Sequence, residues 1–261
     1  MEVSLLDTNL ILDDYFPKRK RHDEMKKFVQ TFKYGDLSYI NSVGRECIDA
    51  ISKALADCSL VLNNLILRKH KGSKSWDETD PNLRRETVKD AIDQLKSKPG
   101  DFEKNLDLII TFLDLNREWI TAVQEQELRG FMMAIVPNAV ADFSGYISGR
   151  YSLRTPLYPN GEGKEMEGIR SFLLKFIPKP YNSYDLTIAV DILVLAVHGE
   201  SNGEKYSRIS FFTADEDFLS NLGKAKEGFD QGQISELNFD PKCLYFENPY
   251  ESKSSLNEPT S

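Results

Sequence analysis

The sequence is poor in cysteine, histidine and tryptophan, with three, three and two copies in 261 residues. The cysteines are Cys47, Cys58 and Cys243, an odd number with no closely spaced pair. This pattern predicts free thiols that behave as small buried hydrophobes in a reducing cytoplasm. Scattered histidines without cysteine pairs argue against a zinc site and against a histidine-based hydrolase.

The chain also lacks an excess of positive charge and a long apolar run. Its net charge of −8 argues against a broadly basic, nucleic-acid-coating surface, although local basic patches remain compatible with it. No apolar run reaches the roughly 20 residues of a membrane span, and no signal-peptide pattern precedes the first predicted strand. We therefore expect a cytoplasmic protein that makes no membrane contact.

The remaining composition, with 40% hydrophobic and 28% charged residues, is enough to build a substantial globular core. Residues 1–12 are rich in Val, Leu and Ile without polar alternation, which predicts a strand covered on both faces. Further strands are predicted at 36–42, in 208–219 and at 242–249. Helical patterns follow the first and second of these strands, and Ser42 is a plausible N-cap for the second of these helices. Strands alternating with helices predict an α/β fold with a parallel sheet between two helical layers.

The middle of the chain, residues 59–180, shows helical patterns and no convincing strand. We therefore predict one domain over 1–250, in which segments 1–58 and 181–250 form the core and 59–180 is a helical insertion. Residues 152–168 read as a loop, and the polar residues 251–261 as a disordered tail.

Four carboxylates stand where such a sheet would gather ligands. Asp7 and Asp215 follow strands, and ligands of parallel sheets bind beyond the carboxyl ends of strands. Glu46 borders the apolar arc of the helix after the second strand, and Asp185 begins a helix that is apolar nearly all round. Taken singly, Asp185 reads equally well as a helix cap, Glu46 as a surface acid and Asp215 as a turn residue.

Taken together, four acids at one sheet edge point to a cation. Two carboxylates about 5 Å apart repel each other by roughly 3 kcal/mol at an effective dielectric constant near 20. A cation would relieve this repulsion, and an all-oxygen ligand set favours Mg²⁺ or Mn²⁺ over zinc.

The motifs around these acids resemble those of PIN-domain ribonucleases, in the family's order. The segments are "LLDTNLIL", "INSVGRECID", "YDLTIAVDILVLA" and "FFTADEDF", and "LYFENPYE" is similar to the family's last strand. The resemblance covers residues 1–55 and 183–250. It implies a PIN-like three-layer α/β/α sandwich, although the predicted insertion is much longer than is usual in the family.

The resemblance also implies roles for individual residues. Asp7, Glu46, Asp185 and Asp215 would be the catalytic, metal-binding acids, and Asp217 an auxiliary metal-binding acid. Thr213 matches the hydroxyl beside the last acid, and Asn9 a polar residue that braces the first.

The expected reaction is hydrolysis of phosphodiester bonds in RNA by a Mg²⁺- or Mn²⁺-dependent nuclease, of the endoribonuclease type found among toxin–antitoxin systems. Metal-activated water needs no side-chain nucleophile, in keeping with the absence of a Ser/His or Cys/His arrangement. RNA, rather than another phosphodiester, is implied by the resemblance alone.

Basic groups should ring an acidic site that attracts a polyanion. The run "PKRKRH" after the first strand supplies candidates, which read equally as a solvated helix start: Lys18, Arg19, Lys20 and Arg21. Further candidates lie in the insertion, where the tryptophans fit core or surface roles better than base stacking: Arg84, Arg85, Arg117, Arg129, Trp76 and Trp119. The apolar insertion also suits a protein partner such as an antitoxin, and a homodimer stays open.

Two other classes of protein compete with a nuclease. Phosphatases with an aspartyl nucleophile use a second aspartate two residues after the first, where this chain has Asn9. A catalytically silent PIN-like scaffold that binds RNA or protein is the stronger alternative, although the presence of all four acids argues against a decayed site.

Overall fold

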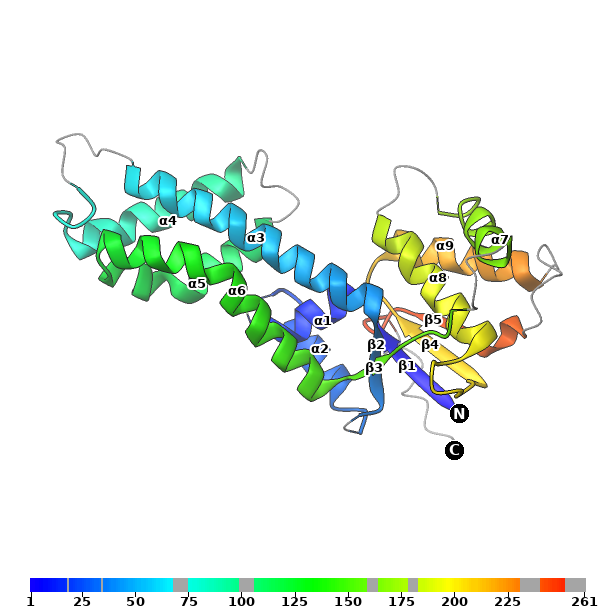
Figure 1. The fold of residues 1–261 in the computed structure, drawn as a ribbon. Coiled ribbons are helices and arrows are strands. Elements are labelled where there is room, and N and C mark those ends of the chain that lie inside the picture. The colour runs from blue at the N-terminus through cyan, green and yellow to red at the C-terminus, as the bar shows by residue number, and fades with distance from the viewer. Residues whose placement is uncertain are drawn as a thin grey trace, which may run out of the picture. The chain divides into compact units, whose positions relative to one another are not determined.

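The computed structural model describes residues 1–17, 19–33, 35–67, 75–98, 106–158, 164–177, 183–230 and 240–251. The chain forms two compact units (Figure 1). The first unit comprises Met1–Cys47 and Tyr146–Ser261, and the second comprises Ile48–Gly145. Helices α3 (Asn41–Leu67) and α6 (Glu125–Arg150) each contribute residues to both units.

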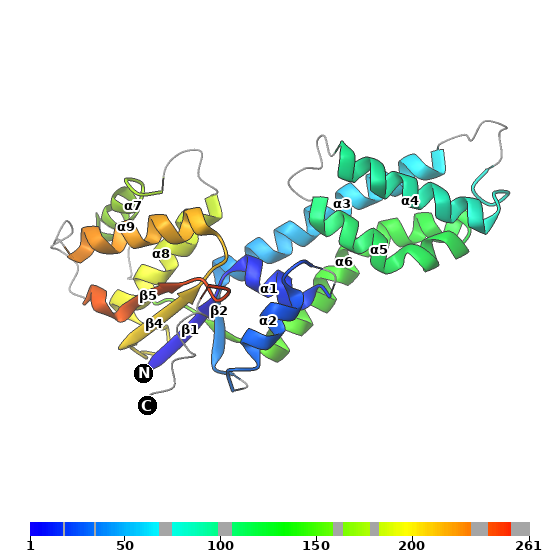
Figure 2. The same cartoon turned by 180° about the vertical axis from the view of Figure 1, so that it is seen from behind.

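The first unit is built on a five-stranded parallel sheet with the strand order β3-β2-β1-β4-β5. The strands are β1 (Glu2–Leu6), β2 (Leu37–Ile40), β3 (Ser152–Arg154), β4 (Arg208–Phe212) and β5 (Leu244–Glu247). Four of them, β5, β4, β1 and β2, lie side by side in the view from behind (Figure 2). The other elements of this unit, besides parts of α3 and α6, are α1 (Thr8–Tyr15), α2 (His22–Val29), α7 (Lys164–Leu173), α8 (Ser183–His198), α9 (Glu216–Asp230) and the 3₁₀ turn η2 (Pro241–Cys243).

Two neighbouring phenylalanines of β4 show that helices cover both faces of the sheet. Successive side chains of a strand point to opposite faces. Phe212 packs edge-on against Phe28 of α2, with 5.1 Å between ring centroids, whereas Phe211 packs against Phe218 of α9 at 6.0 Å. The sheet therefore lies between helical layers, and the predicted three-layer α/β/α fold is confirmed.

A second aromatic contact shows which helices share a layer with α9. Phe172 of α7 lies 4.4 Å from Phe229 of α9 between ring centroids, and α7 also packs on α8. Figure 1 shows α7, α8 and α9 grouped together beside the sheet.

The first strand is shorter than predicted. It ends at Leu6, because Asp7 accepts a hydrogen bond from the backbone N–H of Thr8 and so caps α1. The following residues Leu10, Ile11 and Leu12 are all buried in α1. A short helix buried nearly all round has the same unbroken apolar pattern as a buried strand, which explains why residues 7–12 were wrongly predicted as strand.

The predicted strand-free middle is also wrong at one place. Ser152–Arg154 forms β3, which pairs in parallel with β2 at the edge of the sheet. None of its three residues is buried, because Ser152 and Arg154 are half-buried and Leu153 is exposed, so the segment carries no signal of a buried apolar strand. The compact helical unit is accordingly Ile48–Gly145 rather than 59–180. Of the predicted tail 251–261, residues after Glu251 lie outside the described part of the chain.

The second unit consists of helical segments. Besides its parts of α3 and α6 it contains α4 (Pro81–Ser97) and α5 (Leu106–Ala122), which pack against each other. Trp76 is buried and donates its indole N–H to the Val123 carbonyl oxygen at 3.2 Å. Arg84 lies 5.2 Å from the centre of the Trp76 ring, so both residues serve the core of this unit.

One described helix, α3, has the length and composition of a membrane span. It has 27 residues, and its mean hydropathy reaches 1.3 over 18 residues. Core helices of water-soluble proteins meet the same criterion, so this property does not itself place the helix in a membrane. It does qualify the prediction that no segment is apolar enough to span one.

Candidate functional site

The predicted acids gather where the strand order of the sheet reverses. Strands β1 and β4 are neighbours in the middle of the sheet, although β2 and β3 separate them along the chain. Their last residues, Leu6 and Phe212, are register partners, so both strands end at one level. Ligands of open parallel sheets bind beyond the carboxyl ends of the strands at such a switch point.

Asp7 is fixed at this point by hydrogen bonds to both of its carboxylate oxygens. The Thr8 backbone N–H donates to Oδ1 at 2.8 Å, and the Thr213 hydroxyl donates to Oδ2 at 2.7 Å. Thr213 Oγ1 in turn accepts the Asp215 backbone N–H at 3.0 Å. Asp7 itself is only 4% exposed. Its carboxylate is therefore held in one orientation by residues that follow β1 and β4.

Glu46 is linked to Asp7 through Thr8. The Thr8 hydroxyl donates to Glu46 Oε2 at 2.6 Å, while the Thr8 backbone N–H serves Asp7. Glu46 is half-buried in the second turn of α3. Thr8 thus orients two acids at once, one through its backbone N–H and one through its hydroxyl.

Asp185 and Asp215 lie at the starts of two further helices. Asp185 is in the first turn of α8, and Asp215 directly precedes α9, where its Oδ1 accepts the Phe218 backbone N–H at 2.9 Å. The N-terminus of a helix carries a partial positive charge that favours a nearby carboxylate. Both acids are half-buried.

The four acids act on each other electrostatically. Burial, followed by the charges of Glu46 and Asp185, raises the pKa of Asp7 to about 7, against the lowering effect of the Thr213 and Thr8 hydrogen bonds. Burial and the charges of Glu46 and Asp215 raise the pKa of Asp185 to about 6. The charges of these acids are therefore linked in pairs, Asp7 with Glu46 and Asp185, and Asp185 with Glu46 and Asp215, and their role as one site stays a prediction.

A divalent cation would neutralise this concentration of negative charge, and the oxygen donors match the preference of Mg²⁺ and Mn²⁺. Within the described residues, however, no group of three or more His, Cys, Asp or Glu side chains is arranged to hold an ion. Mg²⁺ typically keeps several waters and takes only one or two carboxylates directly. A metal ion at these four acids is therefore a proposal.

Two of the predicted supporting residues lie at the margin of this cluster. Asp217 is exposed in the first turn of α9, and Asn9 is half-buried in the first turn of α1. The hydrogen bonds described above for Asp7 come from Thr8 and Thr213. The roles of Asp217 and Asn9 stay predictions.

The basic run after β1 is largely engaged within the protein. Arg19 forms an ion pair with Asp13, with 2.5 Å between Nε and Oδ1, and the Arg21 guanidinium lies 4.7 Å from the centre of the Tyr250 ring. Lys20 is exposed, and Lys18 lies outside the described residues. An RNA contact by Arg19 would compete with its buried carboxylate partner, which leaves Lys20 as the better candidate.

The arginines of the second unit have different surroundings. Arg84 is buried and donates to the carbonyl oxygens of Thr79 and Val123 at 3.0 and 2.8 Å, so its role is structural. Arg129 is paired with Glu125 within α6.

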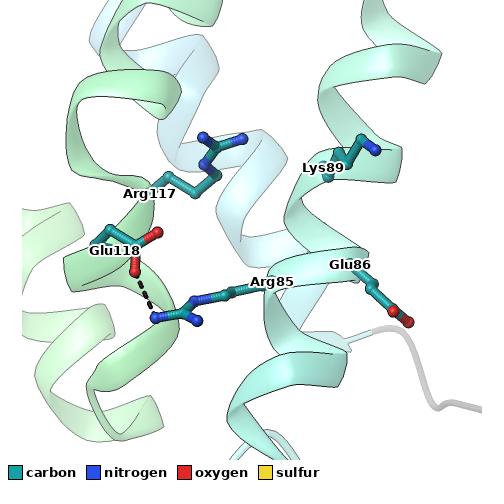
Figure 3. Close-up of a pocket in the computed structure, with 5 residues that line it drawn as sticks. All are labelled: Arg85, Glu86, Lys89, Arg117 and Glu118. Atoms are coloured by element: carbon teal, nitrogen blue, oxygen red, sulfur yellow. Dashed lines mark hydrogen bonds and ion pairs between the residues drawn. The ribbon is translucent and has the colours of Figure 1, made fainter.

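The other arginines line a shallow pocket between α4 and α5 (Figure 3). Its lining residues are Arg85, Glu86, Lys89, Arg117 and Glu118. Arg85 donates to Glu118 at 2.6 Å. Figure 3 shows Glu86 and Lys89 pointing away from α5. The cations of the pocket are offset by acids and do not converge on one point, so they build no anion site.

Sequence reasoning missed a set of buried acids besides the four acids of the candidate site. Asp14 accepts hydrogen bonds from the hydroxyls of Tyr146 and Tyr151, and pairs with Arg150 at 2.5 Å. The other buried acids of this kind are Asp13, Asp191 and Glu200. An acid inside an otherwise apolar run of the sequence, as at Asp13, Asp14 and Asp191, was the signal that could have revealed them. Such an acid is expected to be buried, and a buried carboxylate needs hydrogen-bond or ion-pair partners.

No protein-family model, curated protein or solved structure matches the chain. The likeness to PIN-domain ribonucleases therefore rests on the motifs in the sequence, and the activity that it implies is a proposal.

Proposed function

We propose that the protein is a metal-dependent endoribonuclease of the PIN type, whose Mg²⁺ or Mn²⁺ is held by four acids: Asp7, Glu46, Asp185 and Asp215. The observation that supports this proposal best is the electrostatic coupling of these acids at the switch point of the sheet. Carboxylates that lie close together either take up a proton or bind a cation, and a cation is the alternative that fits catalysis at neutral pH.

The metal, when bound, lowers the pKa of a water and stabilises the charge that develops on the phosphate. The protein's own residues prepare the acids for this task. The hydroxyls of Thr213 and Thr8 fix the carboxylates of Asp7 and Glu46, so that these ligands need little reorganisation when an ion arrives. A hydrogen bond from the Phe218 backbone N–H of α9 orients Asp215 in the same way.

The decisive experiment is cleavage of single-stranded RNA by the purified protein with Mg²⁺, Mn²⁺ or EDTA. We expect cleavage with either metal, none with EDTA, and loss of cleavage in Asp7→Asn and Asp185→Asn. Asp93→Asn, which changes an exposed acid on α4, serves as the matched control and should cleave like the native protein. Equal cleavage by native and Asp7→Asn protein would overturn the proposal.

A catalytically silent scaffold is the second candidate, and one observation favours it. The described residues contain no group of three or more side chains arranged as metal ligands. A scaffold predicts RNA or protein binding that is unaffected by metal and by Asp7→Asn. The cleavage experiment above, run together with a binding assay, separates the two candidates.

The second unit is the part of the chain that we assign to a protein partner. Among its exposed apolar side chains are Leu115, Trp119 and Met133, and Met133 is 85% exposed. An antitoxin-like partner or a second copy of the chain would cover such residues, and size-exclusion chromatography with light scattering of the purified protein tests the second possibility. We place this activity in the cytoplasm, where the cysteines, which are all free, stay reduced.

A further inference from the structure

Helix α1 carries two consecutive buried acids in its last turn, Asp13 and Asp14. They are 4% and 3% exposed. The C-terminal end of a helix bears a partial negative charge, which disfavours a carboxylate there. A buried charge moreover lowers stability unless it is paired and hydrogen-bonded. Both acids therefore depend on partners outside α1.

Asp14 is held by the end of α6 and by the residue that follows it. The hydroxyls of Tyr146 and Tyr151 both donate to Asp14 Oδ2. Arg150 donates from Nε to Oδ2 at 2.5 Å and from Nη2 to Oδ1 at 3.2 Å. The ring of Tyr15, the last residue of α1, packs edge-on against the Tyr146 ring, with 5.0 Å between centroids. These contacts tie the last turn of α1 to the segment that leads into β3.

Asp13 is held on a different side of the same helix. Consecutive side chains of an α-helix point about 100° apart, because one turn takes 3.6 residues. Arg19 Nε lies 2.5 Å from Asp13 Oδ1, and the Tyr250 hydroxyl donates to Oδ2 at 3.0 Å. Hydrogen bonds depend on direction. Two sets of them on different sides therefore fix the rotation of α1 about its own axis.

The apolar residues of α1 do not fix this rotation by burial alone. Leu10, Ile11 and Leu12 are consecutive and all buried, so they span about 200° of the helix circumference. A helix with one apolar stripe is oriented by the burial of that stripe. The hydrophobic effect is non-directional, so a helix that is apolar on most sides gains no single orientation from it. The hydrogen bonds of Asp13 and Asp14 provide the missing direction.

The other end of α1 carries residues of the candidate site. Asp7 caps the helix by accepting the Thr8 backbone N–H at 2.8 Å, and the Thr8 hydroxyl donates to Glu46 at 2.6 Å. The helix has eight residues, so it is only about 12 Å long. Its Cα atoms lie roughly 2.3 Å from the axis, so a rotation by about 25° would move each of them by about 1 Å. Such a rotation would misdirect both Asp7 and Thr8.

We infer that Asp14 is a positioning residue: together with Asp13 it fixes the rotation of α1 and thereby the directions of Asp7 and Thr8. This inference rests on the metal-dependent nuclease function proposed above. Buried ion pairs are a poor source of stability, and in some proteins they select one arrangement of the packed elements instead. A displacement of about 1 Å in a catalytic group can lower the rate about 100-fold.

The test separates a positioning role from a contribution to stability. An apolar variant replaces the whole Asp14 cluster with side chains of similar size: Asp14→Leu, Tyr146→Phe, Arg150→Met and Tyr151→Phe. Replacing a buried ion pair in this way is often neutral or stabilising. The single variant Asp14→Asn keeps the shape of the side chain and one acceptor oxygen, so it should retain part of the positioning and serves if the apolar variant does not fold.

Glu200→Gln is the matched control. Like Asp14, Glu200 is buried and accepts hydrogen bonds from an arginine and a tyrosine. These partners, Arg154 and Tyr206, belong neither to α1 nor to α6. Each full-length variant is examined by urea unfolding, by titration calorimetry with Mn²⁺ and by the kinetics of RNA cleavage.

We expect the apolar variant to unfold at the same urea concentration as the native protein or a higher one. Its Mn²⁺ affinity should nevertheless fall about 10-fold and its kcat about 10- to 100-fold, with KM for RNA little changed. Asp14→Asn should show smaller losses in the same direction, and Glu200→Gln should keep the native affinity and kcat.

Native Mn²⁺ affinity and native kcat in the Asp14 variants would overturn the inference, whatever their stability, and leave the proposed function intact. Equal losses in Asp14→Asn and Glu200→Gln would also overturn it, because any buried carboxylate would then have the same effect. If the native protein neither binds Mn²⁺ nor cleaves RNA, the proposed function itself fails, and the inference fails with it.

Discussion

Replacing Asp7 by asparagine should stabilise the metal-free protein at pH 8 while removing its response to divalent metal. In the fold, burial and neighbouring acids raise the pKa of Asp7 from 3.8 to about 7. Each pH unit of difference between folded and unfolded pKa corresponds to about 1.4 kcal/mol. Ionising Asp7 in the folded protein therefore lowers the free energy of unfolding by about 4 kcal/mol.

The sign of the pH dependence follows from which state binds the proton more tightly. Between pH 4 and pH 7 the folded protein holds a proton on Asp7 that the unfolded chain has lost, so stability falls as the pH rises. Above pH 7 Asp7 is ionised in both the folded and the unfolded state, and the full loss of about 4 kcal/mol in the free energy of unfolding is present. The asparagine side chain of the variant does not titrate, and its amide can hydrogen-bond with the Thr8 N–H and the Thr213 hydroxyl.

The assay is thermal unfolding of native and variant protein at pH 4.5 and pH 8 in EDTA, repeated with Mn²⁺. We expect similar melting temperatures at pH 4.5 and a variant that is more stable by about 10 °C at pH 8. Mn²⁺ at 100 times its dissociation constant should stabilise the native protein by about 2.7 kcal/mol and the variant much less. Asp93→Asn is the control for removing an exposed acid. A stability difference between native and variant protein that is the same at both pH values would refute the reasoning.

Three further substitutions test other parts of the structure. Arg19→Ala should lower the free energy of unfolding by about 3 kcal/mol, because it leaves Asp13, whose side chain is 6% exposed, without its ion-pair partner; a urea titration measures this. Lys20→Ala should leave stability unchanged but weaken RNA binding and reduce the salt slope by about 0.7, and a slope equal to that of the native protein would remove Lys20 from the RNA path. Arg84→Leu should destabilise the second unit by about 2 kcal/mol or more through lost carbonyl contacts, and faster amide exchange confined to residues 75–145 would locate the effect.

The sequence alone determined the fold class, and it singled out the four acids of the proposed site. Buried parallel strands are recognisable in a sequence as short apolar runs, and their carboxyl ends lie at one edge of the sheet. Acids placed after two such runs, Asp7 and Asp215, were therefore predictable from local pattern. Glu46 and Asp185 followed from their places near the starts of helices, together with the family resemblance.

Tertiary structure alone decided the features that depend on contacts distant in sequence. Strand β3 has three residues and exists because the edge of β2 offers it hydrogen-bond partners. The Thr213 hydroxyl donates to Asp7, 206 residues away in the sequence, and the Thr8 hydroxyl donates to Glu46, 38 residues away. Such pairings leave no periodic signal, because the satisfaction of a buried polar group depends on which surfaces the folded chain brings together.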